Sequence, residues 1–316
     1  MYISVIIPAY NAAPYLERAL QSVLIQTRPA NEIIVVDDGS TDNTVEIAGQ
    51  FGEQVKLICQ ANIGVSAARN AGILAAKSNW IAFLDADDEW LPDRLRLQCD
   101  LVEYQKDLSW VTGNFLYCHC GQGHKTYPAL TEKEMAKVKA SLGQRRAFDS
   151  FFEAYSLRAS GNTNTVLVRK DKLFEAGLFP EGQKIIEDED LWLKLGYMGL
   201  RLGFVHEPIA VYHIQIPGSA TQTITDAKEV ETFLVRHVEL AQKAGYPQGY
   251  DFCLRSILGH WIYRLLMAGK SREVRRLLQR FGFLLDVYCR VTSYISSFCP
   301  SLWKWNEKRK YPDREI

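Results

Sequence analysis

The sequence predicts an α/β protein with a mostly parallel sheet flanked by helices, followed by an α-helical C-terminal extension. Short apolar runs alternate with helical patterns along the first hundred residues, which is typical of βα units. Acidic and turn-forming residues follow directly after several of these runs, at the sheet edge where α/β proteins bind ligands. Beyond about residue 219 the pattern becomes wholly helical, so we expect one domain over residues 1–222 and a second over 223–316.

Four strands and their crossover helices are expected in the first hundred residues. Apolar and β-branched runs place the strands at 3–8, 32–36, 56–59 and 80–84. Apolar residues at helical spacing place the helices at 14–26, 44–51, 66–77 and 92–106, and Pro92 suits the first turn of the last one.

The later elements are expected to mix strands, helices and one surface excursion. In the first domain we expect a strand at 109–117, a polar excursion over 121–150 with one helix at 132–139, a helix at 148–157, a strand at 163–168, and helices at 170–176 and 189–198. The second domain should contain helices at 226–244, 251–268, 271–281 and 284–298.

Composition places the chain among ordinary globular proteins. Of its 316 residues 47% are hydrophobic, and 37 basic side chains balance 37 acidic ones, which excludes a general attraction to nucleic acid. Seven scattered cysteines favour a reducing compartment, and the N-terminus lacks the pattern of a signal peptide. We therefore expect a cytoplasmic protein. The sequence contains no apolar run long enough to cross a bilayer.

Three acidic groups carry the functional signal. Asp37 and Asp38 follow the second strand, residues 85–88 follow the fourth, and residues 187–190 open a helix. Taken alone, the first and third groups suit turn and helix-cap positions. The three carboxylates within 85–88 repel one another unless a cation compensates, and their oxygens suit Mg²⁺ or Mn²⁺ carrying a substrate's phosphates.

The order of the motifs is more specific than any one of them. The chain reads VIIPAYN at 5–11, VVDDGS at 35–40, NIG at 62–64, ARN at 68–70, FLDADD at 83–88, GLFPE at 177–181, ED at 187–188 and LWLKL at 191–195. Over about residues 3–220 this order resembles the family 2 glycosyltransferases with the GT-A fold. The resemblance implies an inverting transferase that uses a nucleotide-diphospho-sugar, with residues 1–222 as the GT-A catalytic domain.

The resemblance also implies a donor-binding set. In such enzymes the nucleotide base stacks near the residues matching Pro8 and Tyr10, and the carboxylate matching Asp38 hydrogen-bonds it. Uracil is the expected base because Asp38 can accept its N3 proton, although thymine presents the same edge. Arg69 matches an arginine near the base and the phosphates.

The metal-binding and catalytic carboxylates follow from the same resemblance. Asp85 and Asp87 match the Asp-x-Asp pair, in which the second carboxylate binds the Mn²⁺ or Mg²⁺ that holds the diphosphate and the first lies towards the ribose and the metal. Asp188 matches the catalytic base, which takes the proton of the acceptor hydroxyl. Family members often carry a histidine near the metal, in a segment that reads YHIQIPGS at 212–219 here. Either His213 or Gln215 is therefore expected as the third metal contact.

We predict the transfer of one sugar from a UDP-sugar to a hydroxyl of a saccharide or lipid-linked saccharide, in cell-surface polysaccharide synthesis. The Gln-x-x-Arg-Trp motif of processive synthases is absent from 212–219, which favours single transfers. The main alternative is a non-catalytic GT-A-fold component of a polysaccharide assembly complex.

Three other functions fit less well. A phospho-acceptor regulatory domain would leave Arg69 and Asp188 without a task, and a sugar nucleotidyltransferase would need a glycine-rich loop at residues 8–11. The spacing of Cys118, Cys120 and His124 does not suit a zinc site.

The C-terminal extension is basic and rich in aromatic residues. These features come from Arg272, Arg275, Arg276 and Arg280 on one helix, an apolar stretch over 281–298, and then Trp303, Lys304, Trp305, Lys308, Arg309 and Lys310. This composition suits either the headgroup region of an anionic membrane or a helical bundle with a solvated basic face. In the first case the protein would lie at the inner face of the cell membrane and take a lipid-linked acceptor.

Overall fold

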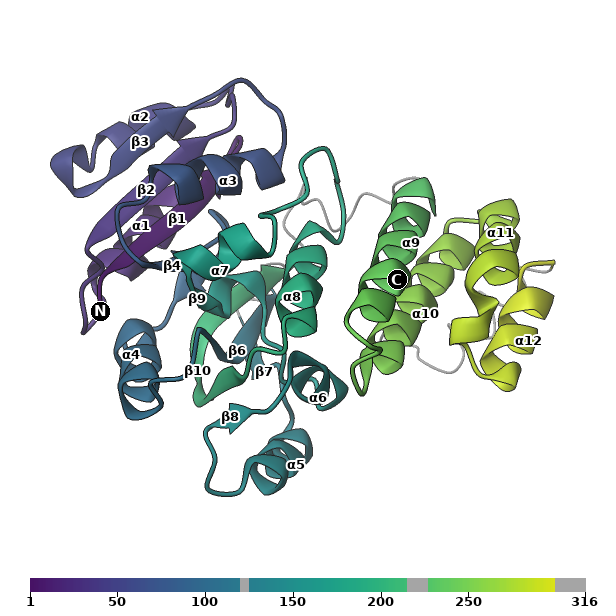
Figure 1. Ribbon diagram of the computed structural model, residues 1–316. Helices are drawn as coiled ribbons and strands as arrows, with labels where there is room; N and C mark the ends of the chain where they lie inside the picture. Colours follow the sequence, from purple (N-terminus) through teal and green to yellow (C-terminus); the bar gives the residue numbers. More distant parts are fainter. Residues whose placement is uncertain (120–124, 215–226, 299–316) are drawn as a thin grey trace. The chain divides into compact units, whose positions relative to one another are not determined.

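The computed structural model describes residues 1–119, 125–214 and 227–298 (Figure 1). The chain folds into two compact units, one within residues 1–219 and the other within 220–316. The expected boundary at residue 222 lies outside the described residues, so its position stays a prediction.

The first unit is built on one mixed sheet. Its first four strands are β1 (Ile3–Ala9), β2 (Glu32–Asp37), β3 (Lys56–Cys59) and β4 (Trp80–Phe83). They lie in the order β3-β2-β1-β4 and all run parallel. The side chains of β1 are buried along its whole length, as expected for a parallel strand covered by helices on both faces.

Beyond β4 the sheet is no longer purely parallel. It continues with β9 (Leu167–Arg169), β6 (Trp110–His119), β10 (Leu202–Ile214) and β5 (Glu89–Trp90), while β7 (Lys125–Pro128) pairs with β6 and β8 (Ala147–Phe148) pairs with β10. The pair β6–β10 is parallel, whereas β9 runs antiparallel to both β4 and β6. The expected parallel arrangement therefore describes the N-terminal half of the sheet.

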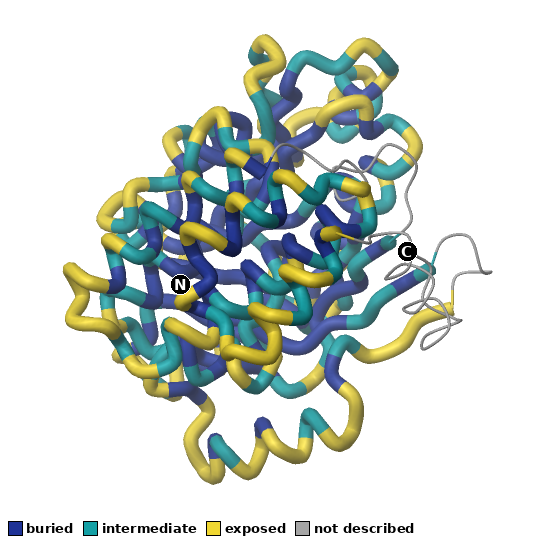
Figure 2. Tube along the Cα trace, turned by 90° about the vertical axis from the view of Figure 1, so that its right-hand side faces the viewer, coloured by how far each residue is buried: buried dark blue, intermediate teal, exposed yellow. Residues whose placement is uncertain are grey.

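Helices cover both faces of the sheet. They are α1 (Leu16–Leu24), α2 (Thr44–Gly49), α3 (Val65–Ala75), α4 (Arg94–Tyr104), α5 (Glu132–Leu142), α6 (Phe151–Ser156), α7 (Lys170–Glu175) and α8 (Glu187–Tyr197), with short 3₁₀ turns η1 (Gly52–Gln54) and η3 (Thr163–Thr165). Helices α1 and α4 share one hydrophobic core with β1. Helix α3 packs on β1 and β2 so closely that a Cβ at Gly72 would lie 2.5 Å from the Ile6 side chain. Figure 2 shows the buried residues gathered inside and the exposed ones on outer loops and helix faces.

The predicted α/β class is confirmed, and most expected elements are present. Strands β5, β7, β8 and β10 were not expected. Residues 125–150 of the predicted excursion contain β7 and β8 together with the expected helix α5. The strand expected at 163–168 begins only at Leu167, because residues 163–165 form the turn η3.

The second unit is helical, as expected. It contains α9 (Ala227–Lys243), α10 (Tyr250–Met267), α11 (Ser271–Phe281), a 3₁₀ turn η5 (Gly282–Leu284) and α12 (Val287–Ser296). Helix α10 packs against α9 and α11, and α12 packs against α11. Within residues 227–298 and the other described ranges, every helix is too short or too polar to span a bilayer.

Candidate active site

The predicted carboxylates gather at one edge of the sheet. Strands β2, β1 and β4 run parallel and side by side, so their carboxyl ends lie at the same edge. Asp37 ends β2, and residues 85–88 follow β4 closely. Contacts from α3 and from the η3 turn bring the first turn of α8, which holds Glu187 and Asp188, to this place.

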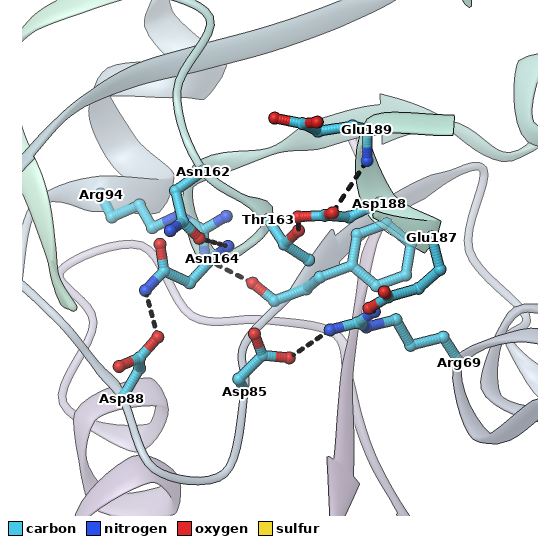
Figure 3. Close-up of polar contacts among 11 residues, drawn as sticks. Arg69, Asp85, Asp88, Arg94, Asn162, Thr163, Asn164, Glu187, Asp188 and Glu189 are labelled. Carbon is cyan, nitrogen blue, oxygen red and sulfur yellow. Dashed lines mark hydrogen bonds and ion pairs between the residues drawn. The ribbon is translucent and has the colours of Figure 1, made fainter. Parts of the chain in front are cut away.

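Arg69 of α3 joins two of the predicted acidic groups (Figure 3). Its Nη2 lies 2.8 Å from Asp85 Oδ1 and its Nη1 lies 2.9 Å from Glu187 Oε1. Burial lowers the pKa of Arg69, but the charges of Asp85 and Glu187 outweigh burial and hold that pKa above its ordinary value. The arginine that the resemblance placed near the base and phosphates thus bridges the Asp-x-Asp segment and the start of α8.

Asp87 and Asp88 differ in their surroundings. Burial and the charge of Asp85 raise the pKa of Asp87 to about 6, so its negative charge is poorly compensated in the structure. Arg18 of α1 donates a hydrogen bond of 2.5 Å to the backbone carbonyl of Asp87, which holds the loop in place. Asp88 is fully buried, and both of its oxygens accept hydrogen bonds, from the backbone N–H of His213 and from Asn164 Nδ2.

Asp188 lies in the first turn of α8 with its carboxylate held by two donors. Thr163 Oγ1 donates to Asp188 Oδ2 at 2.9 Å, and the backbone N–H of Glu189 donates to Asp188 Oδ1 at 2.8 Å (Figure 3). The predicted catalytic base is therefore fixed in orientation and lies one residue from the glutamate that Arg69 binds. This geometry brings Asp85 and Asp188 into one site.

The two glutamates beside Asp188 hold their protons more tightly than free glutamate. Burial and Asp188 raise the pKa of Glu187 to about 7, against the opposing charge of Arg69. Burial together with Asp188 and Glu187 raises the pKa of Glu189 to about 8. The first turn of α8 therefore carries less negative charge at neutral pH than its four acidic residues would suggest.

Asp38 holds a loop of the protein. Its Oδ1 accepts hydrogen bonds from Gln60 Nε2 at 2.7 Å and from the backbone N–H of Ile63 at 3.1 Å, and its Oδ2 accepts one from Gly64 at 2.8 Å. Each carboxylate oxygen can accept two hydrogen bonds, so Oδ2 keeps acceptor capacity for a ligand. A hydrogen bond from a nucleotide base to Asp38 would be made in addition to these three hydrogen bonds.

The residues expected to stack the base lie at the end of β1. Pro8 is buried inside the strand, in register with Val36 of β2, whereas Tyr10 directly beyond the strand is 52% exposed. Of the two residues, Tyr10 alone has a ring exposed to solvent. Asp38 directly follows the end of the neighbouring strand β2.

The third metal contact stays a prediction. Gln215 lies outside the described residues. His213 is buried, and its Nε2 lies 3.1 Å from Glu89 Oε1, so its ring is engaged with a carboxylate next to the Asp-x-Asp segment. Cys120 and His124 of the disfavoured zinc candidate also lie outside the described residues.

The carboxylate chemistry fits a divalent cation at Asp87. Among the described residues no group of three or more His, Cys, Asp or Glu side chains is arranged to hold a metal alone. Mg²⁺ and Mn²⁺ often bind through one or two carboxylates together with substrate phosphates, so a full protein cage is not required. The raised pKa of Asp87 indicates a site whose negative charge a cation would stabilise.

The structure adds residues to the site that sequence reasoning missed. Tyr212 on β10 is close enough to this cluster to feel its charges: burial and the charges of Asp88, Asp85, Asp87 and Asp188 together raise the pKa of Tyr212. Arg18 reaches the Asp-x-Asp loop from α1, and Thr163 reaches Asp188 from η3. A polar run between apolar segments, such as GNTNT at 161–165, was the one sequence signal for Thr163.

The chain is similar in sequence to known glycosyltransferases. Residues 4–157 match the family described as "Glycosyl transferase family 2". Over 302 residues the chain is 32% identical to an uncharacterized glycosyltransferase of Rickettsia conorii (strain ATCC VR-613 / Malish 7), an alignment that covers 94% of this chain and 46% of that protein. The chain therefore contains a glycosyltransferase family 2 domain. The whole chain spans less than half the length of that relative.

Solved structures show the same fold. The crystal structure of S. aureus TarS 1-349 in complex with UDP-GlcNAc is 16% identical, with a TM-score of 0.64, and the match covers 100% of this chain and 93% of that one. The mannosyltransferase PcManGT from Pyrobaculum calidifontis, in complex with GDP-Man and Mn²⁺, is 18% identical, with a TM-score of 0.56 and coverages of 96% and 87%. The predicted GT-A fold is confirmed.

Proposed function

We propose that this chain transfers one sugar from a nucleotide-diphospho-sugar to a hydroxyl group of an acceptor, with inversion at the anomeric carbon. The observation that carries the proposal is the double ion pair of Arg69 with Asp85 and Glu187. This pairing supports a single site in which one acidic group serves the departing diphosphate and a neighbouring carboxylate serves the acceptor.

Asp188 is the proposed catalytic base. It takes the proton from the acceptor hydroxyl while that oxygen bonds to the anomeric carbon and the bond from this carbon to the diphosphate breaks. Attack from the face opposite the leaving group inverts the configuration in one displacement. The hydrogen bonds from Thr163 and from the Glu189 N–H keep the carboxylate pointed in one direction.

Asp87, assisted by Asp85, is the proposed holder of Mn²⁺ or Mg²⁺. When bound, the ion stabilises the negative charge that develops on the leaving diphosphate. Three observations support this choice: the raised pKa of Asp87, the carboxylate chemistry, and the Mn²⁺ in the structure of the Pyrobaculum mannosyltransferase. Arg69 keeps Asp85 oriented, and Arg18 fixes the loop that carries Asp87.

A UDP-sugar is the proposed donor. TarS, which shares the fold, was crystallised with UDP-GlcNAc. In this chain Asp38 can accept the N3 proton of uracil with its remaining lone pair, and the exposed ring of Tyr10 is available to stack on the base. Pro8, buried two residues before Tyr10, is the second residue proposed to lie beside the base.

The proposed acceptor is a saccharide or lipid-linked saccharide used in cell-surface polysaccharide synthesis, at the cytoplasmic face of the membrane. The support is an exposed apolar surface on and around α12, formed by Phe283, Val287, Tyr288, Val291, Tyr294, Ile295 and Phe298. No residue of α12 is buried. The basic aromatic segment 303–310 that follows in the sequence lies outside the described residues.

Three arginines of α11 bind other parts of the second unit, which supports a helical bundle as the alternative to membrane binding. Arg276 and Arg280 both pair with Glu231 of α9, and Arg275 Nη1 donates to the backbone carbonyl of Ser297. These three side chains therefore stabilise the second unit. The membrane proposal rests on α12 and on the segment that follows it.

The test of the transferase proposal is metal-dependent turnover of a donor panel. UDP-, dTDP- and GDP-sugars are incubated with wild type and with Asp87→Ala, and release of the nucleoside diphosphate is measured with and without Mn²⁺. We expect Mn²⁺-dependent release with at least one donor by wild type and its loss in the variant. Equal background rates would instead favour the non-catalytic component of an assembly complex, and labelling of Asp87 by a small phosphodonor would favour a regulatory domain.

A further inference from the structure

A short turn before β9 buries an unusual number of polar side chains. Thr163 is 2% exposed, and Asn164 and Thr165 are fully buried, although such residues are mostly found at protein surfaces. Buried polar groups cost free energy unless they are hydrogen-bonded, so a buried polar turn needs a dense set of partners.

Helix α4 and strand β6 hold this turn from one side. Gln98 Nε2 donates to the backbone carbonyl of Thr165 at 2.7 Å, and Arg94 Nη2 donates to that of Val166 at 2.9 Å. The hydroxyl oxygens of Thr112 and Thr165 lie 2.8 Å apart. Gly161 precedes the turn with φ +77°, and a Cβ there would lie 1.7 Å from Thr112 Oγ1, so the approach requires glycine.

The other side of the turn binds the two acidic segments of the site (Figure 3). Thr163 Oγ1 donates to Asp188 Oδ2 at 2.9 Å, and Asn164 Nδ2 donates to Asp88 Oδ2 at 2.6 Å. The two donors are consecutive residues, whereas Asp88 and Asp188 belong to the loop after β4 and to α8. One rigid turn therefore fixes the proposed base relative to the proposed metal-binding loop.

We propose that Thr163 and Asn164 are positioning residues for the transfer reaction, Thr163 acting on Asp188 and Asn164 on the loop 85–88. The inference rests on the proposed function, since it assigns both residues to that site. A hydrogen bond from Thr163 holds the carboxylate of the base in one orientation. The bond from Asn164 holds Asp88, and with it the backbone that presents Asp85 and Asp87.

Titratable and charged groups lie around Asp188 on several sides. Glu187 and Glu189 face it from α8, Arg69 from α3 and the hydroxyl of Tyr212 from β10. Thr163 supplies a neutral hydroxyl donor to the carboxylate from η3. Replacing Thr163 by valine removes that donor with little change in volume and leaves the four titratable neighbours in place.

Thr163→Val and Thr163→Ser test the first half of the proposal. With the donor that wild type uses best, Thr163→Val should lower kcat about tenfold, as expected for losing a hydrogen bond to a charged group, and leave the KM for the donor unchanged. Its pH–rate profile should differ from that of wild type, because the carboxylate of Asp188 has lost a hydrogen-bond donor. Thr163→Ser keeps the hydroxyl and should restore both quantities.

Asn164→Leu tests the second half. This variant should raise the Mn²⁺ concentration needed for half-maximal rate and weaken Mn²⁺-dependent binding of UDP measured by calorimetry, because the loop 85–88 is no longer held. Thr163→Val should leave UDP binding unchanged. Two neighbouring residues should therefore give two separable defects.

Thr165→Val is the control for a merely structural role. Thr165 bonds to Thr112 and to the backbone of residue 162 in the same turn but touches neither acidic segment. It should lower the unfolding temperature while keeping the wild-type pH–rate profile. A Thr165→Val profile that matches that of Thr163→Val, or a Thr163→Val profile that matches wild type, overturns the inference.

A measurement without turnover separates this inference from the proposed function. The ¹³C carboxyl resonance of Asp188, assigned with Asp188→Asn, is compared between wild type and each variant at one neutral pH. Its chemical shift should change in Thr163→Val, which loses the hydrogen bond to the carboxylate, and not in Thr165→Val, even if no donor is turned over. Absence of turnover in wild type would overturn the proposed function, whereas an unchanged resonance in Thr163→Val would overturn the role of Thr163.

Discussion

Arg69 Nη1 lies 2.9 Å from Glu187 Oε1, although 118 residues separate the two in the sequence. The same guanidinium binds Asp85, and its side chain is only 5% exposed. A buried arginine with two carboxylate partners fixes the relative positions of α3, the Asp-x-Asp segment and α8. The ion pairs therefore serve the assembly of the site as well as its charge balance.

We predict that Arg69→Met costs about 3 kcal/mol of unfolding free energy, because it leaves Asp85 and Glu187 close together without their cation. Arg169→Met is the matched control: Arg169 also pairs with a carboxylate, Asp171, but both side chains are about half exposed, and its loss should cost less than about 1 kcal/mol. Urea unfolding of both variants measures the difference. Equal costs for the two would show that the Arg69 bridge contributes no more than a surface ion pair.

Much of the site could be predicted because its residues follow strands. Asp37, Asp38 and Asp85 come at or just after the ends of apolar β-branched runs, and the parallel pairing of β2, β1 and β4 brings those ends to one edge. Such local patterns need no knowledge of tertiary contacts. The positions of α8 and of Arg69 relative to that edge came from the family resemblance, since nothing local indicates them.

The elements and site residues that were predicted wrongly or missed depend on tertiary contacts. Residues 163–165 carry threonines, which favour strands. They form a turn, and Gln98 and Arg94 of α4 bind the backbone carbonyls of Thr165 and Val166 at its end. Strand β10 was missed because Pro208 interrupts it, and the register with β6 shifts on both sides of that proline. Arg18 and Tyr212 enter the site through packing that no spacing in the sequence records.

The raised pKa values of two glutamates predict how stability depends on pH. The pKa of Glu187 lies at about 7 and that of Glu189 at about 8, both above the ordinary value of 4.5. Between about pH 4.5 and about pH 8 the folded protein binds more protons than the unfolded chain. The unfolding free energy should therefore fall as the pH rises through this range. The contribution is fully present below about pH 4.5 and is lost above about pH 8.

Glu189→Gln should make that decline shallower and raise the stability at the alkaline end, because the amide stays neutral. Urea unfolding at several pH values across the window measures the slope. Glu175→Gln is the control, since Glu175 is half exposed and pairs with Lys172 on the surface of α7. Parallel slopes for Glu189→Gln and wild type would contradict the assignment of the raised pKa to a group that matters for stability.

Asp38 should be required for the structure of the loop 60–64 as well as for donor binding. Asp38→Ala removes the acceptor of three hydrogen bonds, two of them from backbone N–H groups, and we expect a loss of about 2–4 kcal/mol in unfolding free energy. Asp38→Asn keeps one oxygen and should lose less. Urea unfolding in the absence of ligand measures this part of the effect, and UDP binding by calorimetry measures the rest. Full stability in Asp38→Ala would show that the loop does not depend on these bonds.

The exposed face of α12 should bind anionic lipid. Val287 and Tyr288 are 79% and 78% exposed, and Ile295 is 63% exposed, so replacing Tyr288 and Ile295 by serine removes apolar surface without opening the core. We expect wild type to cosediment at low salt with vesicles of phosphatidylcholine and phosphatidylserine more than with phosphatidylcholine alone, because basic residues add electrostatic attraction to apolar insertion. The double variant should lose most of this binding.

Ile25→Ser, at an equally exposed apolar position in the first unit, should bind as wild type does. Binding that is unchanged in the double variant would move the membrane contact away from α12, and no binding by wild type would favour a helical bundle without a lipid partner.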